Sequence, residues 1–196
     1  MHDAPIVGDT PALDLANTHF AIRGKPVEGL PNKEALERWL TSMHTSQGLP
    51  PVSAADSAGL ASFIELRDAI RVVAQALIVG GGEIGDAVDR INDFARANHT
   101  NPRLVMEHTG LIARSESDAT GMRRLLAEFA WDAIDLFGTE RKKLLRSCPA
   151  PDCPLFFIKD HSRRKWCRPS CANRVRAARA YRKQRRTAVP GSGASI

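Results

Sequence analysis

The stretch Cys148-Pro149-Ala150-Pro151-Asp152-Cys153, with Cys167-Arg168-Pro169-Ser170-Cys171 after thirteen intervening residues, decides the fold of the C-terminal part of the chain. It holds all four cysteines of the sequence, as two close pairs. Such pairs suit a tetrahedral ion, because each pair can form a knuckle that contributes two ligands. Thiolates are soft ligands, and Zn²⁺ is their common partner at a closed site. The spacing therefore predicts a structural Zn²⁺ site with Cys148, Cys153, Cys167 and Cys171 as its ligands.

Three other interpretations of the cysteines are two disulfides, an iron–sulfur cluster and four unrelated thiols. The sequence starts with Met1-His2-Asp3 and shows no export signal, which disfavours disulfides. The regular pairing disfavours four unrelated thiols. Four thiolate ligands leave no open position for a catalytic water, so we expect a structural site.

The residues between and after the two pairs complete a small domain. Residues 155–158 and 165–167 are expected to pair as a hairpin around residues 159–162. Ser170 and Cys171 would then open a helix that runs to Tyr181 and beyond. Knuckle, hairpin and helix in this order predict a treble-clef-like zinc finger with four cysteine ligands.

The charge distribution separates this finger from the rest of the chain. Residues 141–186 hold sixteen basic and two acidic side chains, a balance of +14, whereas the other residues hold twelve basic and twenty acidic ones, a balance of −8. Such asymmetry is typical of a basic module on an acidic body. We therefore expect an acidic domain at residues 1–140, the basic finger at 141–187 and a disordered tail of small and polar residues at 188–196.

The acidic part has mainly helical periodicity. Apolar residues recur at helical spacing after a cap at Asn32, after a capping box of Ser53 and Asp56, from residue 84 to about 98, and after a cap at Ser117. One or two helical turns are also expected within residues 11–20. On the second of these helices, Leu60, Phe63, Ile64, Ile70, Ala74 and Leu77 are expected to form the apolar face.

One segment of the acidic part differs from this helical pattern. Two short apolar runs flank His108-Thr109-Gly110 and predict a β-hairpin over residues 103–115. Trp39 and Trp131 lie on apolar helix faces and are expected in the core. The predicted fold class is thus mainly α with a small β-hairpin (α+β), followed by the four-cysteine finger.

The helix after Cys171 carries many cations and no acidic residue, because nothing after Asp160 is acidic. Steps of three and four residues place several of the cations on a shared face. Nucleic acid is the natural partner of such a surface, with DNA favoured and RNA as a variant. The alternative is a zinc-stabilised interaction module whose basic helix docks on the acidic body or on an acidic protein. The candidate contact residues are Arg163, Arg164, Arg174, Arg176, Arg179, Arg182 and Lys183.

The finger resembles the CGNR-type zinc finger at the C-terminus of a bacterial family of putative stress-induced transcription regulators. The matching residues are 148–149, 153, 155–157, 160–163, 165–167 and 171–174. The N-terminal part is similar to the ABATE domain of that family, through residues 12–18 and 65–67. The resemblance implies DNA binding by the finger, a role in transcription regulation and no enzymatic activity. Ala172 stands where the family has glycine; if this position lies in the first helical turn, alanine is harmless or better there.

Four polar residues match the family motifs of the N-terminal part: Asp14, Asn17, Thr18 and Arg67. One interpretation is that they line a pocket for a small-molecule effector. The interpretation that we favour is structural: Asn17 and Thr18 cap or turn the chain, and Asp14 pairs with an arginine.

The sequence gives no support to an enzyme, because it holds no catalytic triad motif, Walker loop, G-x-G-x-x-G or H-E-x-x-H. Its longest apolar run, residues 70–82, is too short for a membrane span. We expect a soluble cytoplasmic protein. A homodimer is compatible with the sequence.

Overall fold

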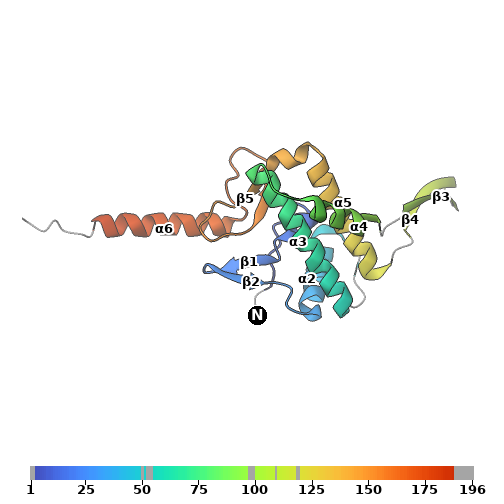
Figure 1. Cartoon of the computed structure of the whole chain (residues 1–196), viewed down its shortest axis with the longest axis horizontal. Helices are drawn as coiled ribbons and strands as arrows, with labels where there is room; N and C mark the ends of the chain where they lie inside the picture. Colours follow the sequence, from blue (N-terminus) through green and yellow to red (C-terminus); the bar gives the residue numbers. More distant parts are fainter. Residues whose placement is uncertain are drawn as a thin grey trace, which may run out of the picture.

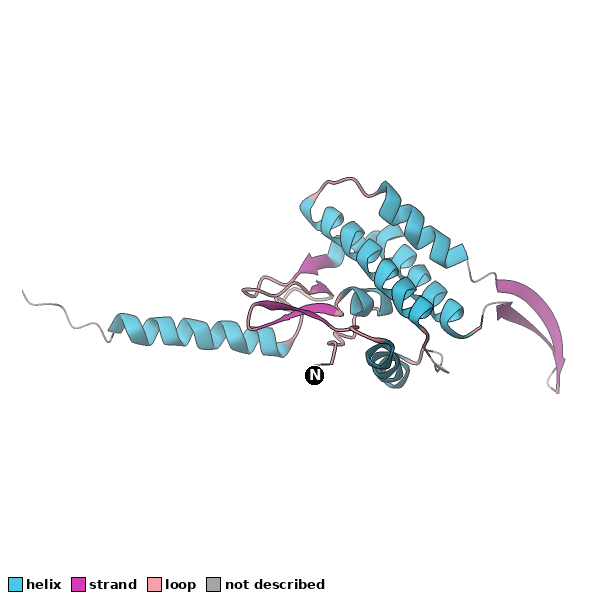
Figure 2. Ribbon diagram, turned by 60° about the horizontal axis from the view of Figure 1, so that its bottom comes forward, coloured by secondary structure: helices cyan, strands magenta, loops and turns pink. Residues whose placement is uncertain are grey.

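The computed structural model describes residues 3–49, 51, 55–96, 100–108, 110–117 and 120–187. A body of helices occupies the centre, and two elements project from opposite ends of it: a long C-terminal helix and a β-hairpin (Figures 1 and 2). The tail predicted at residues 188–196 lies outside the described residues. Each sheet in the described part of the chain has two antiparallel strands. The fold class is therefore confirmed as mainly α with small β elements.

The N-terminal segment forms a helix and a hairpin. Helix α1 (Pro11–Ala16) begins after Thr10, whose side chain accepts a hydrogen bond from the amide of Leu13. Strands β1 (His19–Ile22) and β2 (Lys25–Glu28) follow, with His19 opposite Glu28. The one or two helical turns predicted within residues 11–20 are confirmed by α1, which ends at its C-cap Asn17. The strands after it form a hairpin that was not predicted, and its two-residue turn at Arg23 and Gly24 has positive φ angles of 50° and 79°.

Four helices build the body: α2 (Lys33–Gln47), α3 (Ser57–Val79), α4 (Gly85–Arg96) and α5 (Gly121–Gly138). The predicted cap at Asn32 is confirmed, because its side chain accepts a hydrogen bond from the amide of Ala35. Helix α3 is capped by Asp56, which accepts from the amide of Gly59, while Ser53 lies outside the described residues. Its buried face includes Leu66 and Val73, whereas Leu77, predicted on that face, is 38% exposed.

The centre of the body is an aromatic cluster. Trp39 stacks on Phe129, and Phe63 meets the same ring edge-on, each at 5.6 Å between ring centroids. Trp39 is buried as predicted. Trp131 is not in the core: it is 52% exposed. It lies two residues after the buried Phe129, about 200° around the helix, and therefore on the opposite face.

The β-hairpin predicted over residues 103–115 is confirmed and is longer than expected. Strands β3 (Thr100–Glu107) and β4 (Gly110–Ser117) pair along their whole length, and they project away from the helices (Figures 1 and 2). Ser117 is the last residue of β4, so its prediction as a helix cap is wrong. The residue before α5 is Thr120.

The C-terminal finger begins after a short 3₁₀ turn, η1 (Glu140–Leu144). Strand β5 (Leu145–Ser147) pairs with β6 (Phe156–Ile158), and helix α6 (Pro169–Thr187) follows. The sequence predicted residues 165–167 as the partner of β6, which is wrong. Strand β5 takes that place because the first knuckle folds back on itself, with the amide of Cys148 donating to the carbonyl of Leu155 over 2.8 Å. The knuckle is therefore the turn of the hairpin.

The finger is packed directly against the body. Leu155, Phe156 and Phe157 are at most 3% exposed and belong to the same continuous hydrophobic core as Leu13 and Leu66. This packing fixes the position of the four cysteines relative to the N-terminal part.

Candidate metal centre and nucleic-acid interface

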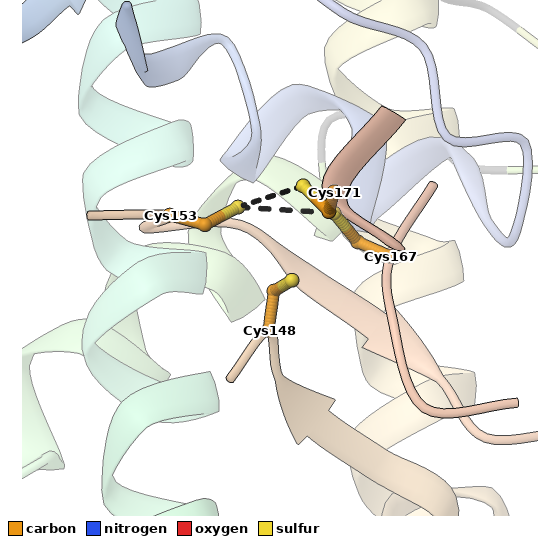
Figure 3. Close-up of side chains that lie close together, drawn as sticks. All are labelled: Cys148, Cys153, Cys167 and Cys171. Carbon is orange, nitrogen blue, oxygen red and sulfur yellow. Dashed lines mark hydrogen bonds between the residues drawn. The ribbon is translucent and has the colours of Figure 1, made fainter. Parts of the chain in front are cut away.

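The four cysteines predicted as ligands meet at one point. Their Sγ atoms all lie within 4.8 Å of one another, and Figure 3 shows the four side chains converging. Cys153 lies 3.8 Å from Cys167 and 3.7 Å from Cys171, and Cys167 lies 3.6 Å from Cys171. All but Cys153 are buried. The separations are those of ligand atoms around a single small cation.

Local backbone geometry sets this convergence. In the first knuckle, Asp152 has a positive φ of 58°, and the amide of Cys153 donates to the carbonyl of Ala150 over 3.1 Å. The second pair spans the start of α6, where the amide of Cys171 donates to the carbonyl of Arg168 over 3.1 Å. A knuckle and a helix start thus each present two thiols to the same space, as the sequence predicted.

The thiols interact strongly with one another. Hydrogen bonds with Cys153, the larger effect, and with Cys167 lower the pKa of Cys148. The hydrogen bonds with Cys148 in turn raise the pKa of Cys153 and of Cys167. Four thiolates at this spacing repel one another, so all four ionise together only around a cation. The donor set and its burial fit Zn²⁺ in a closed tetrahedral site.

Basic side chains lie next to the cluster. Nη2 of Arg174 is 3.9 Å from the Sγ of Cys171. Nε of Arg168 is buried and has no hydrogen-bond partner among the described residues. A Zn²⁺ ion with four thiolates carries a net charge of −2, so these guanidinium groups favour the loaded centre.

Two side chains of the N-terminal segment hold the finger in place. The side-chain amide of Asn17 donates to the carbonyl of Phe156 over 3.0 Å and accepts from the amide of the same residue over 2.8 Å. Asp9 accepts from the amide of Ile158 over 2.8 Å and pairs with both terminal nitrogens of Arg164, at 2.6 and 3.0 Å. Sequence reasoning missed Asp9, because a contact between residues so far apart in the chain leaves no local pattern.

The four residues considered for an effector pocket are buried and hydrogen-bonded to other parts of the protein. Asp14 accepts from the amides of Val7 and Gly8 and from the side chain of Gln47, and no arginine described in the structure pairs with it. The hydroxyl of Thr18 donates to the carbonyl of Leu15 over 2.8 Å.

Arg67, the remaining member of that set, pairs with Glu28 at 2.6 Å and with Asp68 at 2.9 Å. Its side chain is 5% exposed. Together with the clamp of Asn17 on the finger, these contacts support the structural interpretation of the four residues.

Helix α6 carries most of the predicted nucleic-acid contacts. Beyond the buried Val175, all side chains described on it, residues 176–184, are exposed, and the helix extends away from the body (Figures 1 and 2). It does not dock on the acidic part of its own chain, which was one of the alternatives from sequence. Arg163 is exposed on the loop before it. Arg164 differs from the rest, since Asp9 pairs with its guanidinium and only 17% of its side chain is exposed.

A helical body joined to a four-cysteine finger with a projecting basic helix defines a zinc-finger protein. The chain belongs to the ABATE family, described as putative stress-induced transcription regulator, which matches residues 9–140. Residues 145–184 match the CGNR zinc finger. No curated protein matches the chain. Among the described residues, no helix has the length and apolar character needed to cross a bilayer.

Proposed function

We propose that this protein is a zinc-dependent DNA-binding transcription regulator whose finger contacts duplex DNA through α6. The observation that carries the proposal is the projection of a basic helix, free of acidic residues, from a metal-stabilised base. Residues 9–140 would form the regulatory part, and the four cysteines the structural Zn²⁺ site.

The dimensions of α6 suit a DNA groove. Its 19 residues span about 28 Å at about 1.5 Å per residue. The major groove of B-DNA is about 12 Å wide and admits an α-helix. A helix anchored at only one end can enter that groove without a clash from the body.

The basic side chains along α6 divide by their distance from the body. Arg174 and Arg176 lie in the first turns, and the side chain of Arg176 is oriented by a hydrogen bond to Oδ1 of Asn173. We assign these two residues to base edges, because an oriented guanidinium can bind a guanine through two hydrogen bonds. Further out lie Arg179, Arg182 and Lys183, which we assign to phosphates together with Arg163. Arg164 is left out of this set because it is paired with Asp9.

The experiment is duplex binding by the zinc-loaded full chain at several salt concentrations. Each phosphate contact contributes about −0.9 to the slope of log K against log salt, so the four contacts assigned to α6 and the loop before it contribute about −3.6. Arg179→Ala should make the slope less negative by about 0.9, without changing sequence preference. Arg176→Ala, which leaves Arg174 beside the metal centre unchanged, should instead cost about 1–3 kcal/mol and relax specificity at one position.

The control variant is Arg90→Ala. Arg90 lies on α4, which packs on α3 and α5, and it pairs with Glu65 at 3.0 Å. It should bind as the unchanged protein does. A protein that binds no duplex in a salt-dependent way, but binds an acidic protein through α6, would establish the interaction-module function instead.

A further inference from the structure

The tip of the β1–β2 hairpin lies against the zinc finger. A Cβ atom placed on Gly24 would stand 3.3 Å from Oδ2 of Asp152, in the first knuckle. A small cavity of about 130 Å³ lies further along the same contact, lined by Phe20 and Ala21 on one side and by Ser170 and Arg174 on the other. In Figures 1 and 2 the hairpin points in the same direction as α6, beside its first turns.

Two cations flank the glycine of this tip, Arg23 and Lys25. Both are exposed, and among the described residues neither has an acidic group within salt-bridge distance. On the finger side, Arg168 and Arg174 line the cavity beside the hairpin. The tip of the β1–β2 hairpin is therefore basic, although it belongs to the acidic body, and it lies on the side of the molecule from which α6 projects.

The backbone at Arg23 makes this arginine unusual. Its φ is 50°, a left-handed conformation that costs a residue with a Cβ about 1–2 kcal/mol. Glycine, asparagine or aspartate would fit this turn more cheaply. Such strained positions cluster where a side chain has a functional task, and the property that arginine adds here is an exposed positive charge.

We propose that Arg23 and Lys25 form a second DNA contact, on backbone phosphates next to the segment that α6 engages. This inference rests on the proposed function. The close approach of Gly24 to the knuckle fixes the position of the hairpin tip relative to α6. The helix and the hairpin therefore contact the same duplex. Because α6 and the β1–β2 hairpin both lie against the first knuckle, the hairpin needs no rearrangement to reach the phosphates.

The test is a salt titration of the zinc-loaded full chain on a 20-base-pair duplex of mixed sequence. The variant is Arg23→Asn with Lys25→Gln, because asparagine favours the turn and keeps the hairpin folded while both charges are lost. Two lost phosphate contacts should make the slope less negative by about 1.8 and weaken binding at low salt. Arg90→Ala is again the control.

Arg179→Ala, measured in parallel, separates the two proposals. If the hairpin variant keeps the slope of the unchanged protein while Arg179→Ala flattens it, the second contact is wrong and α6 still binds DNA. If the unchanged protein has no salt-dependent affinity for duplex DNA, the proposed function fails and the hairpin contact fails with it. Binding to RNA but not to DNA would overturn both proposals, because α6 and the β1–β2 hairpin would then contact RNA.

Discussion

Asn17 forms hydrogen bonds with both backbone groups of one finger residue, Phe156, and all of these atoms are buried. Asn17→Ala would leave a buried N–H and a buried C=O without partners, at about 1–3 kcal/mol each. We expect a loss of about 3 kcal/mol in the free energy of unfolding, measured by urea denaturation. Asn32→Ala is the matched control, since it removes only a helix cap, worth about 1 kcal/mol. A loss no larger than that of Asn32→Ala would show that the clamp on the finger stabilises the protein no more than a single helix cap does.

Asp14 is a buried carboxylate, and its burial raises its pKa from 3.8 to about 6 despite hydrogen bonds from Val7, Gly8 and Gln47. Between these two values the folded state holds a proton that the unfolded state has released. Stability therefore falls as the pH rises from about 4 to about 6, by up to about 3 kcal/mol.

The variant Asp14→Asn removes this titration and keeps an oxygen for the two backbone amides, while Gln47 can turn its own amide. Relative to the unchanged protein, it should gain stability from pH 4 to pH 7. Chemical denaturation at both pH values measures this gain. A difference between the two proteins that is the same at pH 4 and pH 7 would contradict the assignment.

At the scale of elements, the start of α6 explains why alanine replaces the family's glycine. Ala172 lies inside the helix, and its amide donates to the carbonyl of Arg168 over 3.4 Å. Positive φ is therefore not required there, as the sequence led us to expect. Ala172→Gly should destabilise the helix by about 1 kcal/mol. Hydrogen exchange of the amides in its first turns should then quicken about fivefold, whereas Ala177→Gly should affect only the outer turns.

Elements set by local signals were predictable from the sequence. The caps at Asn32 and Gly48 and the convergence of two cysteine pairs depend on residues close together in the chain. The partner of β6 was not predictable, because residues 165–167 are closer to it in sequence than β5 is and are more apolar than Arg146 and Ser147 of β5. The β1–β2 hairpin was missed because an arginine, rather than asparagine or glycine, opens its turn.

The candidate site was predictable in its chemistry but not in its setting. Cysteine spacing and charge are visible in the sequence, so the four thiols and the basic helix could be named. The pairing of Arg164 with Asp9, 155 residues away, could not be predicted, and it is the reason why we leave Arg164 out of the proposed DNA contacts. The exposure of Trp131 was not predictable either, because it depends on which face of α5 packs against the other helices.

At the scale of the whole molecule, the body and the finger are joined by their shared core. Strand β6 lies against α1, and Asn17 and Asp9 clamp the hairpin of the finger. We propose that residues 1–140 also fold alone, since their helices bury a core of their own around Phe129. The shared surface means that the finger also stabilises the body.

Removal of the metal should therefore reach beyond the finger. We expect one Zn²⁺ per chain in the freshly reduced protein, measured by elemental analysis, and its loss in Cys167→Ser. Without the ion the four thiols have nothing to hold them together, so the start of α6 separates from the knuckle. The helical signal of α1 to α5 should persist in circular dichroism. Their melting temperature should fall by about 10 °C, because the loosened finger no longer covers α1, at about 2–4 °C per kcal/mol.

Added Zn²⁺ should restore the melting temperature of the chelator-treated protein but not that of Cys167→Ser. Ser147→Ala, next to the ligand Cys148 and exposed, should keep both the metal and the melting temperature. Full metal content in Cys167→Ser would show that this thiol is not a ligand. An unchanged melting temperature after complete metal removal would show that the finger holds its place through Asn17, Asp9 and the shared core alone.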